Sequence, residues 1–268
     1  MLPLIFTLIG ILAITATANP VIPGGRVADG EDAQLGQFPY EVSIQKNTAG
    51  FIIHYCAGSI ISPEYIVSAA HCFVDPAQTD LYTVVAGIVN LSDNNVGEQK
   101  RNIDKIVLNS LYPGEEVVAP HDISVAHLSE PLSFTDTIKP INLPQPSQEF
   151  TGIATLSGWG QTEQTLLSNT LQFVDAKLLT SEECNAAIEQ YLNPGDVNPL
   201  STQYNLCTGA LEDYQSFCSG DSGGPLAANN TLIGVISWGL SGCGVTKSPP
   251  AVYVRVSEYI DWIQENTE

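Results

Sequence analysis

Short stretches of β-type sequence recur along this chain, and each is followed by residues that favour turns. The stretches combine β-branched, aromatic and small side chains, and the first of them alternates strictly between apolar and polar residues. They are residues 40–45, 60–68, 82–87, 103–109, 152–159, 171–179, 231–238 and 251–256. Many short strands with regularly placed turns are typical of antiparallel sandwiches and barrels. The sequence therefore predicts an all-β protein, with ample length for a real core.

Two helices and one linker interrupt this β pattern. Thr180-Ser181-Glu182-Glu183 has the form of a capping box and predicts a helix over residues 184–191. Near the C-terminus, Val256, Tyr259, Ile260 and Ile263 have the spacing of one helix face. Three prolines between residues 139 and 149 interrupt any regular element. We expect them to join two halves, roughly residues 27–143 and 144–268.

The N-terminus has the pattern of a targeting segment. Residues 2–14 are apolar but too short to span a bilayer comfortably, and Ala16-Thr17-Ala18 gives the small-x-small cleavage pattern. Residues 1–18 are therefore predicted to be a signal peptide, with an uncleaved signal anchor as the alternative. No later stretch is long and apolar enough for a transmembrane helix. The sequence predicts a secreted, extracellular and soluble protein.

A stretch rich in proline and glycine, residues 19–26, follows the predicted cleavage site and ends in Arg26. The chain has only 9 basic residues, so an exposed arginine at the end of such a stretch favours a processing site. An ordinary ordered loop is the alternative. Cleavage there would free an amine on Val27.

Charge and cysteine content exclude several classes of protein. A net charge of −20 excludes nucleic-acid binding by phosphate neutralisation and argues against a polybasic membrane anchor. Six cysteines in a secreted chain imply three disulfides, for which the sequence alone allows 15 connectivities. No Cys-x-x-Cys or His-x-x-x-His spacing occurs, so we expect no metal site and no cofactor.

A glycine-rich segment, Ser219-Gly220-Asp221-Ser222-Gly223-Gly224-Pro225, carries the strongest chemical signal. A serine hydroxyl becomes a nucleophile only with an adjacent base and a turn that presents its oxygen. Glycine on both sides allows the turn, and it lets a substrate carbonyl approach backbone N–H groups closely. A polar loop without chemistry is the alternative, so the interpretation requires a histidine and a second buried acid.

Only four histidines are available, so each can be weighed. His71 lies next to Cys72 at the end of a strand of small residues, and these small neighbours leave room around its ring. His54 and His127 are more typical of packing or surface residues. His121 adjoins Asp122, and neighbouring residues of a strand face opposite ways, so one should point inward. Asp122 precedes an apolar stretch, and a buried carboxylate there needs a partner such as a histidine N–H.

Together these pieces resemble the chymotrypsin/trypsin family of secreted serine proteases, in particular its chymotrypsin-like or elastase-like members. The resemblance runs from Val27 to the C-terminus. The segments that carry it are Ser68-Ala69-Ala70-His71-Cys72, His121-Asp122-Ile123-Ser124-Val125, Gly158-Trp159-Gly160, Gly220-Asp221-Ser222-Gly223-Gly224-Pro225, Ser237-Trp238-Gly239 and Ala251-Val252-Tyr253.

The resemblance implies a fold and a set of roles. The fold would be two antiparallel six-stranded β-barrels with the site between them and a C-terminal helix. Ser222 would be the nucleophile, His71 the general base and Asp122 the residue that orients His71. The N–H groups of Gly220 and Ser222 would form the oxyanion hole. The disulfides would be Cys56–Cys72, Cys184–Cys207 and Cys218–Cys243.

The resemblance also implies a role for Arg26. Residues 19–26 would be an activation propeptide, and residues 27–268 the protease domain. Cleavage after Arg26 by a trypsin-like protease would free the ammonium of Val27, which would then pair with Asp221. Asp29 stands where the family usually has glycine.

Substrate preference in the family depends on a pocket that would here comprise Ser216, Phe217, Ser237, Trp238, Gly239, Gly242 and Ala251. Trypsin-like members have an aspartate where this chain has Ser216, so an Arg or Lys side chain would be buried unpaired. Gly239 and Gly242 leave the pocket open, while Phe217 and Ala251 narrow it. A chymotrypsin-like hydrophobic preference is expected. An elastase-like preference for smaller residues is the alternative, and the orientation of Phe217 decides between them.

The remaining expectations concern modification and partners. Asn90 and Asn229 begin N-glycosylation sequons. Calcium near Glu98 is disfavoured because Ile88 stands where the family supplies another ligand. Expected partners are protein or peptide substrates, the activating protease and protein protease inhibitors, and the protein is expected to be a monomer. A catalytically inactive binding or regulatory homologue is the alternative to an enzyme, although such homologues usually lose a triad residue.

Overall fold

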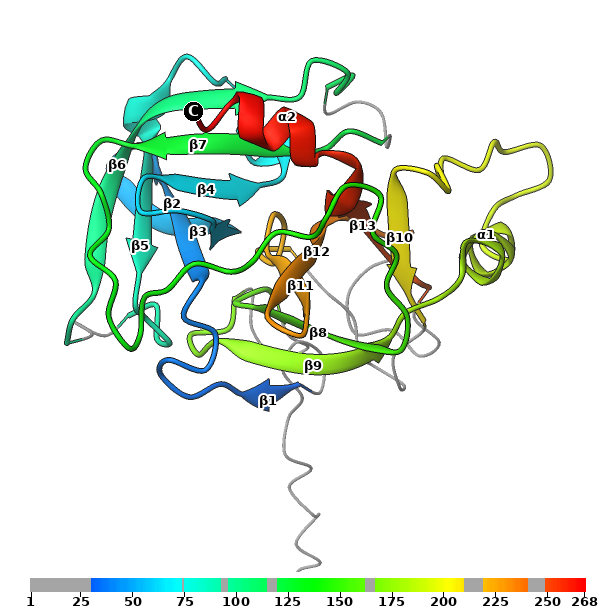
Figure 1. The fold of residues 1–268 in the computed structure, drawn as a ribbon, viewed down its shortest axis with the longest axis horizontal. Helices are drawn as coiled ribbons and strands as arrows, with labels where there is room; N and C mark the ends of the chain where they lie inside the picture. Colours follow the sequence, from blue (N-terminus) through cyan, green and yellow to red (C-terminus); the bar gives the residue numbers. More distant parts are fainter. Residues whose placement is uncertain are drawn as a thin grey trace, which may run out of the picture.

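The computed structural model describes residues 30–73, 75–92, 96–114, 120–161, 167–209, 219–240 and 249–268. Within them the protein consists of short β-strands, three 3-10 turns and two α-helices (Figure 1). The 3-10 turns are η1 (Ala70–Cys72), η2 (Thr79–Leu81) and η3 (Val256–Glu258). Neither of the α-helices in the described ranges has the length and hydrophobicity that a membrane span requires.

Six strands close the first barrel, which contains most of the N-terminal half. They are β2 (Glu41–Thr48), β3 (Phe51–Ile60), β4 (Tyr65–Ser68), β5 (Tyr82–Ala86), β6 (Gln99–Leu108) and β7 (Ser124–Leu128). They pair antiparallel in the order β2-β3-β4-β7-β6-β5, and β5 returns to β2. Alternate residues of β2, Val42 and Ile44, are completely buried in the core of this barrel. The predicted strand at residues 40–45 is confirmed, although its polar residues Glu41 and Ser43 are buried as well.

Six strands of the second half form a curled sheet of seven strands together with β1 from the N-terminal half. These are β1 (Glu31–Asp32), β8 (Ile153–Gly158), β9 (Gln172–Lys177), β10 (Asn205–Thr208), β11 (Pro225–Ala228), β12 (Thr231–Trp238) and β13 (Ala251–Arg255). Their order is β1-β9-β8-β11-β12-β13-β10. A single bridge between Leu178 and Thr208 joins the end of β9 to the end of β10.

The predicted all-β fold with its C-terminal helix is therefore confirmed, with a difference in the second half. The first barrel is closed, whereas the second closes only through the bridge at Leu178, because β10 has four residues and the chain turns into a helix just after β9. The hairpin between β11 and β12 is tight. Asn229 and Asn230 both have positive φ, as a two-residue type I′ turn requires.

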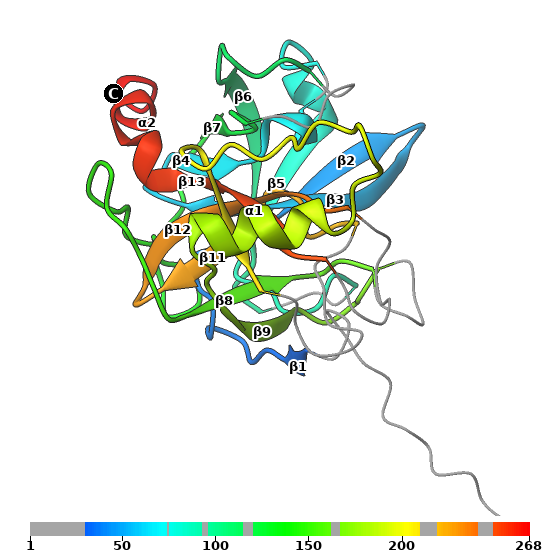
Figure 2. The same ribbon diagram turned by 90° about the vertical axis from the view of Figure 1, so that its right-hand side faces the viewer.

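The helix α1 (Ser181–Glu189) begins where the capping box predicts. The Thr180 hydroxyl accepts from the Glu183 backbone N–H at 3.1 Å, and the Glu183 carboxylate accepts from the Thr180 N–H at 2.9 Å. The helix lies on the outside of the second sheet next to β10 (Figure 2).

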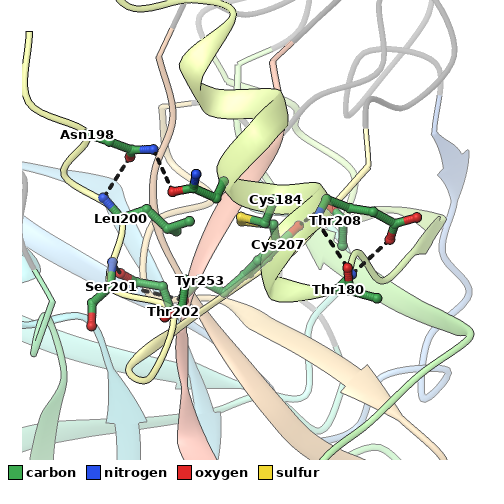
Figure 3. The surroundings of a disulfide bond; sticks show 12 residues. Thr180, Cys184, Asn198, Leu200, Ser201, Thr202, Cys207, Thr208 and Tyr253 are labelled. Atoms are coloured by element: carbon green, nitrogen blue, oxygen red, sulfur yellow. Dashed lines mark hydrogen bonds between the residues drawn. A yellow bond between two sulfur atoms is a disulfide. The ribbon is translucent and has the colours of Figure 1, made fainter.

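The loop that follows α1 is held by its own side chains. Asn198 accepts from the Leu200 N–H and donates to Asn185 of the helix, both at 3.0 Å (Figure 3). Further along, Asn205 accepts from the Ser201 N–H at 3.1 Å. The long segment between Cys184 and Cys207 is thus an ordered loop.

The C-terminal helix α2 (Ile260–Glu265) returns to the first barrel, where it lies beside β7 (Figure 1). Its buried residues Ile260 and Ile263 belong to the same apolar cluster as Val125 of β7 and Val235 of β12. Residues of both halves therefore pack in this cluster, and the second half also has an apolar cluster of its own that includes Leu156, Leu226 and Tyr253.

Candidate active site

His71 and Asp122 come together at the first barrel. His71 lies in η1 directly after β4, and Asp122 lies just before β7, the strand that pairs with β4. Nδ1 of His71 is 2.7 Å from Oδ2 of Asp122, and the His71 backbone N–H donates to Oδ1 at 2.8 Å. A carboxylate only accepts, so Nδ1 carries the hydrogen and Nε2 the lone pair. The imidazole is therefore oriented as a general base requires.

A third hydrogen bond stabilises the Asp122 carboxylate. Ser237, in β12 of the second half, donates its hydroxyl to Oδ2 at 2.6 Å. Asp122 is only 4% exposed, and these bonds replace the water that burial removes. The contact also connects the two halves at the site.

His121, the neighbour of Asp122, points away from this arrangement. Its φ is +74°, and its Nδ1 lies 2.9 Å from the hydroxyl oxygen of Tyr259. Its ring packs on Tyr204 with a centroid distance of 4.5 Å. One residue of the pair was expected to point inward, and that residue is Asp122.

Ser222 lies against the first barrel beside the Cys56–Cys72 disulfide. Its carbonyl oxygen accepts from the Ala57 N–H at 2.8 Å and lies 3.6 Å from Sγ of Cys72. Both disulfide sulfurs are within 4.8 Å of a ring nitrogen of His71. Ser222 is half-buried, as is His71, so both can be reached from solvent.

Only glycine fits directly after Ser222. Gly223 has a φ of +78°, and a Cβ there would lie 2.1 Å from Oγ of Ser68 and 2.6 Å from the carbonyl oxygen of Ala57. The glycine lets the loop that bears Ser222 sit against β3 and β4. Any other residue at position 223 would therefore clash with β3 and β4, and its backbone would also be strained by the positive φ.

The backbone around Ser222 has two available donors. The N–H of Gly223 donates to Ile236 and that of Gly224 to Asp221, both at 2.9 Å. The N–H groups of Gly220 and Ser222 donate to no acceptor among the described residues. Such N–H groups can stabilise an oxyanion, and Gly220 has a φ of +101° that favours glycine.

His54 supports this loop from the first barrel. Its Nε2–H donates to the carbonyl oxygen of Gly220 at 2.9 Å, and its Nδ1 accepts the Ser43 hydroxyl at 2.8 Å. Burial lowers the pKa of His54 to about 4, which keeps the ring neutral. Sequence reasoning assigned His54 to packing or the surface. Nothing local could have linked it to Gly220, 166 residues away.

Asp221, the residue before Ser222, is completely buried. Its Oδ1 accepts the Gly160 N–H at 2.6 Å. A Cβ at Gly158 would lie 2.0 Å from Oδ1, and one at Gly160 would lie 2.2 Å from Oδ2. These two glycines make the space that the Asp221 carboxylate occupies.

The sequence of the chain matches one protein family and several known proteins. The family model for trypsin matches residues 27–263. "Trypsin-1" of Astacus astacus is 35% identical over 247 residues, covering 90% of this chain and 99% of that protein. "Anionic trypsin" of Canis lupus familiaris is 34% identical, covering 93% of this chain and 92% of the dog protein. "Trypsin II-P29" of Gallus gallus is 33% identical, with 92% of this chain and 93% of that protein covered.

The chain belongs to the chymotrypsin/trypsin family of serine proteases. By family it is thus a serine endopeptidase, and the resemblance carried by its motifs is confirmed.

Two disulfides of the protease match the expected pairing. Cys56 is joined to Cys72 and Cys184 to Cys207. The second joins α1 to β10 (Figure 3). Cys218 and Cys243 lie outside the described residues. Because Cys56 and Cys72 are bonded to each other, the cluster that they form with His71 has no thiolate to offer a metal ion.

The predicted substrate pocket of the protease is described only in part. Ser237, Trp238 and Gly239 lie at the end of β12, and Ala251 begins the neighbouring strand β13, where it is 5% exposed. The structure therefore brings these residues to the same end of two neighbouring strands of the second sheet. Ser216, Phe217 and Gly242 lie outside the described residues, and so do Arg26 and Val27.

The two sequons occupy different surroundings. Asn229 is exposed at the tip of the β11–β12 hairpin. The Asn90 side-chain oxygen accepts from Asn169 at 2.7 Å and from Thr170 at 3.3 Å. Asn229 is the more accessible of the two for a glycan.

Proposed function

We propose that the protein is a secreted serine endopeptidase made as a zymogen, and that it cleaves after uncharged hydrophobic residues. The single observation that carries its catalytic part is the arrangement of His71, Asp122 and Ser237. The buried carboxylate holds the imidazole in the tautomer that can accept a proton. Ser222, half-buried beside the same disulfide, is the proposed nucleophile.

Catalysis then follows from these groups. Oγ of Ser222 attacks the substrate carbonyl carbon while Nε2 of His71 takes the hydroxyl proton, and Asp122 stabilises the imidazolium that results. The carbonyl oxygen becomes an oxyanion that accepts from the N–H groups of Gly220 and Ser222. His71 gives its proton to the leaving amine as the peptide bond breaks. Water then attacks the acyl-enzyme, losing a proton to His71, and this proton returns to Ser222 when the acid leaves.

Activation by cleavage after Arg26 completes the proposed function. The freed ammonium of Val27 would pair with the carboxylate of Asp221. The burial of Asp221 supports this pairing, because a completely buried carboxylate is stable only with compensating charge or hydrogen bonds. Arg26→Gln should give a precursor that trypsin no longer activates. Full activity of uncleaved R26Q protein would contradict this part of the proposal.

Preference for uncharged residues rests on Ser216. The relatives named above are trypsins. Trypsin-like members of the family have an aspartate at this position, whereas this chain has Ser216. Without a carboxylate, a buried Arg or Lys side chain would remain unpaired. Ala251, which stands where glycine is common, favours the elastase-like alternative by narrowing the pocket.

Trypsin treatment of the recombinant precursor tests the proposal. The product should hydrolyse peptides with Phe or Leu before the scissile bond faster than those with Ala, and those with Arg slowest. Ser222→Ala is the matched control, because it removes the nucleophile and leaves its surroundings. Ser216→Asp should raise the ratio of Arg to Phe cleavage. A wild-type preference for Arg would contradict the pocket argument, and preference for Ala would favour the elastase-like alternative.

Secretion and glycosylation are proposed from the leader and the sequons. N-terminal sequencing of the protein recovered from a culture medium should begin at Asn19 before activation and at Val27 after it. Treatment with an N-glycosidase should lower its mass, and Asn229→Gln should remove more of that change than Asn90→Gln. Protein substrates and protein protease inhibitors are the proposed partners, and the proposed state is a monomer.

A further inference from the structure

Glu41 is a buried acid that the proposed mechanism does not use. It opens β2 and is 2% exposed. None of the ion pairs among the described residues includes it. A buried carboxylate without a cation costs several kcal/mol, so the group must be neutral or must meet a further partner.

The contacts of Glu41 lie on two strands. Oε2 accepts the hydroxyl of Ser157, in β8. Oε1 has no hydrogen-bond partner among the described residues. Ser59 stands directly opposite Glu41 on β3, is completely buried, and its hydroxyl oxygen is likewise unpartnered in the described part of the chain. One buried water between Oε1 and Ser59 would satisfy both atoms, but it would not compensate a charge.

Glu41 and Asp221 both lie against the end of strand β8. Glu41 accepts from Ser157, and the adjacent Gly158 is one of the two glycines that make space for the Asp221 carboxylate. Ser157 is 1% exposed, so no bulk water screens the two acids from each other. The negative charge of Asp221 therefore disfavours the ionised form of Glu41.

Burial and the negative charge of Asp221 keep the proton on Glu41. Burial is the larger cause of its raised pKa, and the Asp221 charge adds to it, whereas the Ser157 hydrogen bond opposes both. Its neighbour Tyr40, whose pKa is raised by burial and by the charge of Glu41, supplies no positive charge at neutral pH.

We propose that Glu41 is a positioning residue for Asp221 that works only while it holds its proton. In the neutral state it fixes the end of β8 at Ser157, and thereby the glycine backbone against which the Asp221 carboxylate lies. At a pH high enough to ionise Glu41, a second buried negative charge arises near that carboxylate and displaces it. This inference rests on the proposed role of Asp221 in activation.

Glu41→Gln tests the proposal, because the amide keeps the size and the acceptor oxygen but cannot ionise. The pH dependence of kcat/KM of the trypsin-activated enzymes is compared from pH 6 to 10. The alkaline loss of activity should begin about one pH unit or more higher in E41Q than in the wild type. Deprotonation of the Val27 amine also lowers activity at high pH, but loss of the Glu41 charge would favour that deprotonation, so a shift of the E41Q profile to higher pH isolates Glu41. Coincident profiles, or an earlier loss in E41Q, would overturn the proposal.

A second measurement keeps the test independent of activity. In a Ser222→Ala background, the contribution of Glu41 to the free energy of unfolding should fall as pH rises above about 4.3, because only the folded state retains the Glu41 proton there. E41Q should remove that part of the slope. Ser157→Ala should keep Glu41 protonated to higher pH, because it removes the hydrogen bond that favours ionisation. An unchanged slope in both variants would refute the inference, while absence of activity at every pH would refute only the proposed function.

Discussion

Ser237 donates its hydroxyl to the same oxygen of Asp122 that holds the His71 ring, at 2.6 Å. The serine comes from β12 of the second half, and the aspartate precedes β7 of the first. The charge that orients the proposed general base is therefore held by both halves of the protease. Separating the halves should disturb the base even where the first barrel remains folded.

Replacing Asp122 by asparagine should leave the fold intact and abolish most of the activity. The amide can donate to His71, which favours the tautomer that cannot accept the serine proton. In the Ser-His-Asp arrangement this change lowers kcat about 10⁴-fold, and we expect a similar loss in D122N. Steady-state kinetics with a hydrophobic peptide substrate measures it. A loss below about tenfold would exclude Asp122 from the role.

Ser237→Ala should have a smaller effect of the same kind. It removes one hydrogen bond to a charged group, worth about 1.5–3 kcal/mol, so kcat should fall about 10- to 100-fold. The loss should appear in kcat more than in KM if Ser237 acts through Asp122. A change confined to KM would assign its side chain to substrate binding instead.

His54 should make the protease less stable in acid. Its pKa is about 4 in the folded protein and near its ordinary value of 6.5 when unfolded, so the unfolded state binds more protons in between. Stability should decline as pH falls from about 6.5 to about 4, by roughly 3 kcal/mol from this residue. Urea unfolding of wild type and His54→Gln measures the difference, since the amide can still donate to Gly220. An unaltered acid slope in H54Q would contradict this assignment, and His121→Gln should keep most of it.

Gly160→Ala should displace Asp221. A Cβ at residue 160 would lie 2.2 Å from Oδ2 and 2.4 Å from Cγ of that carboxylate, although the backbone of Gly160 is not in the left-handed region. We expect a stability loss of about 1–3 kcal/mol together with a lower fraction of active sites after trypsin treatment. Gly209→Ala is the matched control, because its nearest atom would be 3.4 Å away and stability should change by less than about 0.5 kcal/mol. Equal effects at the two glycines would contradict the steric argument.

Local patterns were enough to predict most of the elements. The strand pattern of β2 and the capping box at Thr180 each reside in a few neighbouring residues, and the structure confirms both elements. Incomplete closure of the second sheet was not predicted, because it depends on the short length of β10 and on where the chain enters α1.

The contacts that hold the candidate site in place were harder to predict than the site residues themselves. The motifs around His71, Asp122 and Ser222 identify themselves by their immediate neighbours. The contacts of Ser237 with Asp122 and of His54 with Gly220 join residues 115 and 166 positions apart. Glu41 and Ser157 are 116 positions apart. Such pairings arise where the two halves pack against each other, and no local pattern encodes them.

The most direct test of the central claim is labelling of the trypsin-activated protein with a serine-directed phosphonate, followed by peptide mapping. The account predicts one label per molecule, on Ser222, in parallel with the appearance of hydrolysis after Phe or Leu. The untreated precursor, R26Q and S222A should remain unlabelled. A folded, correctly cleaved protein that neither takes the label nor hydrolyses any peptide would contradict the claim.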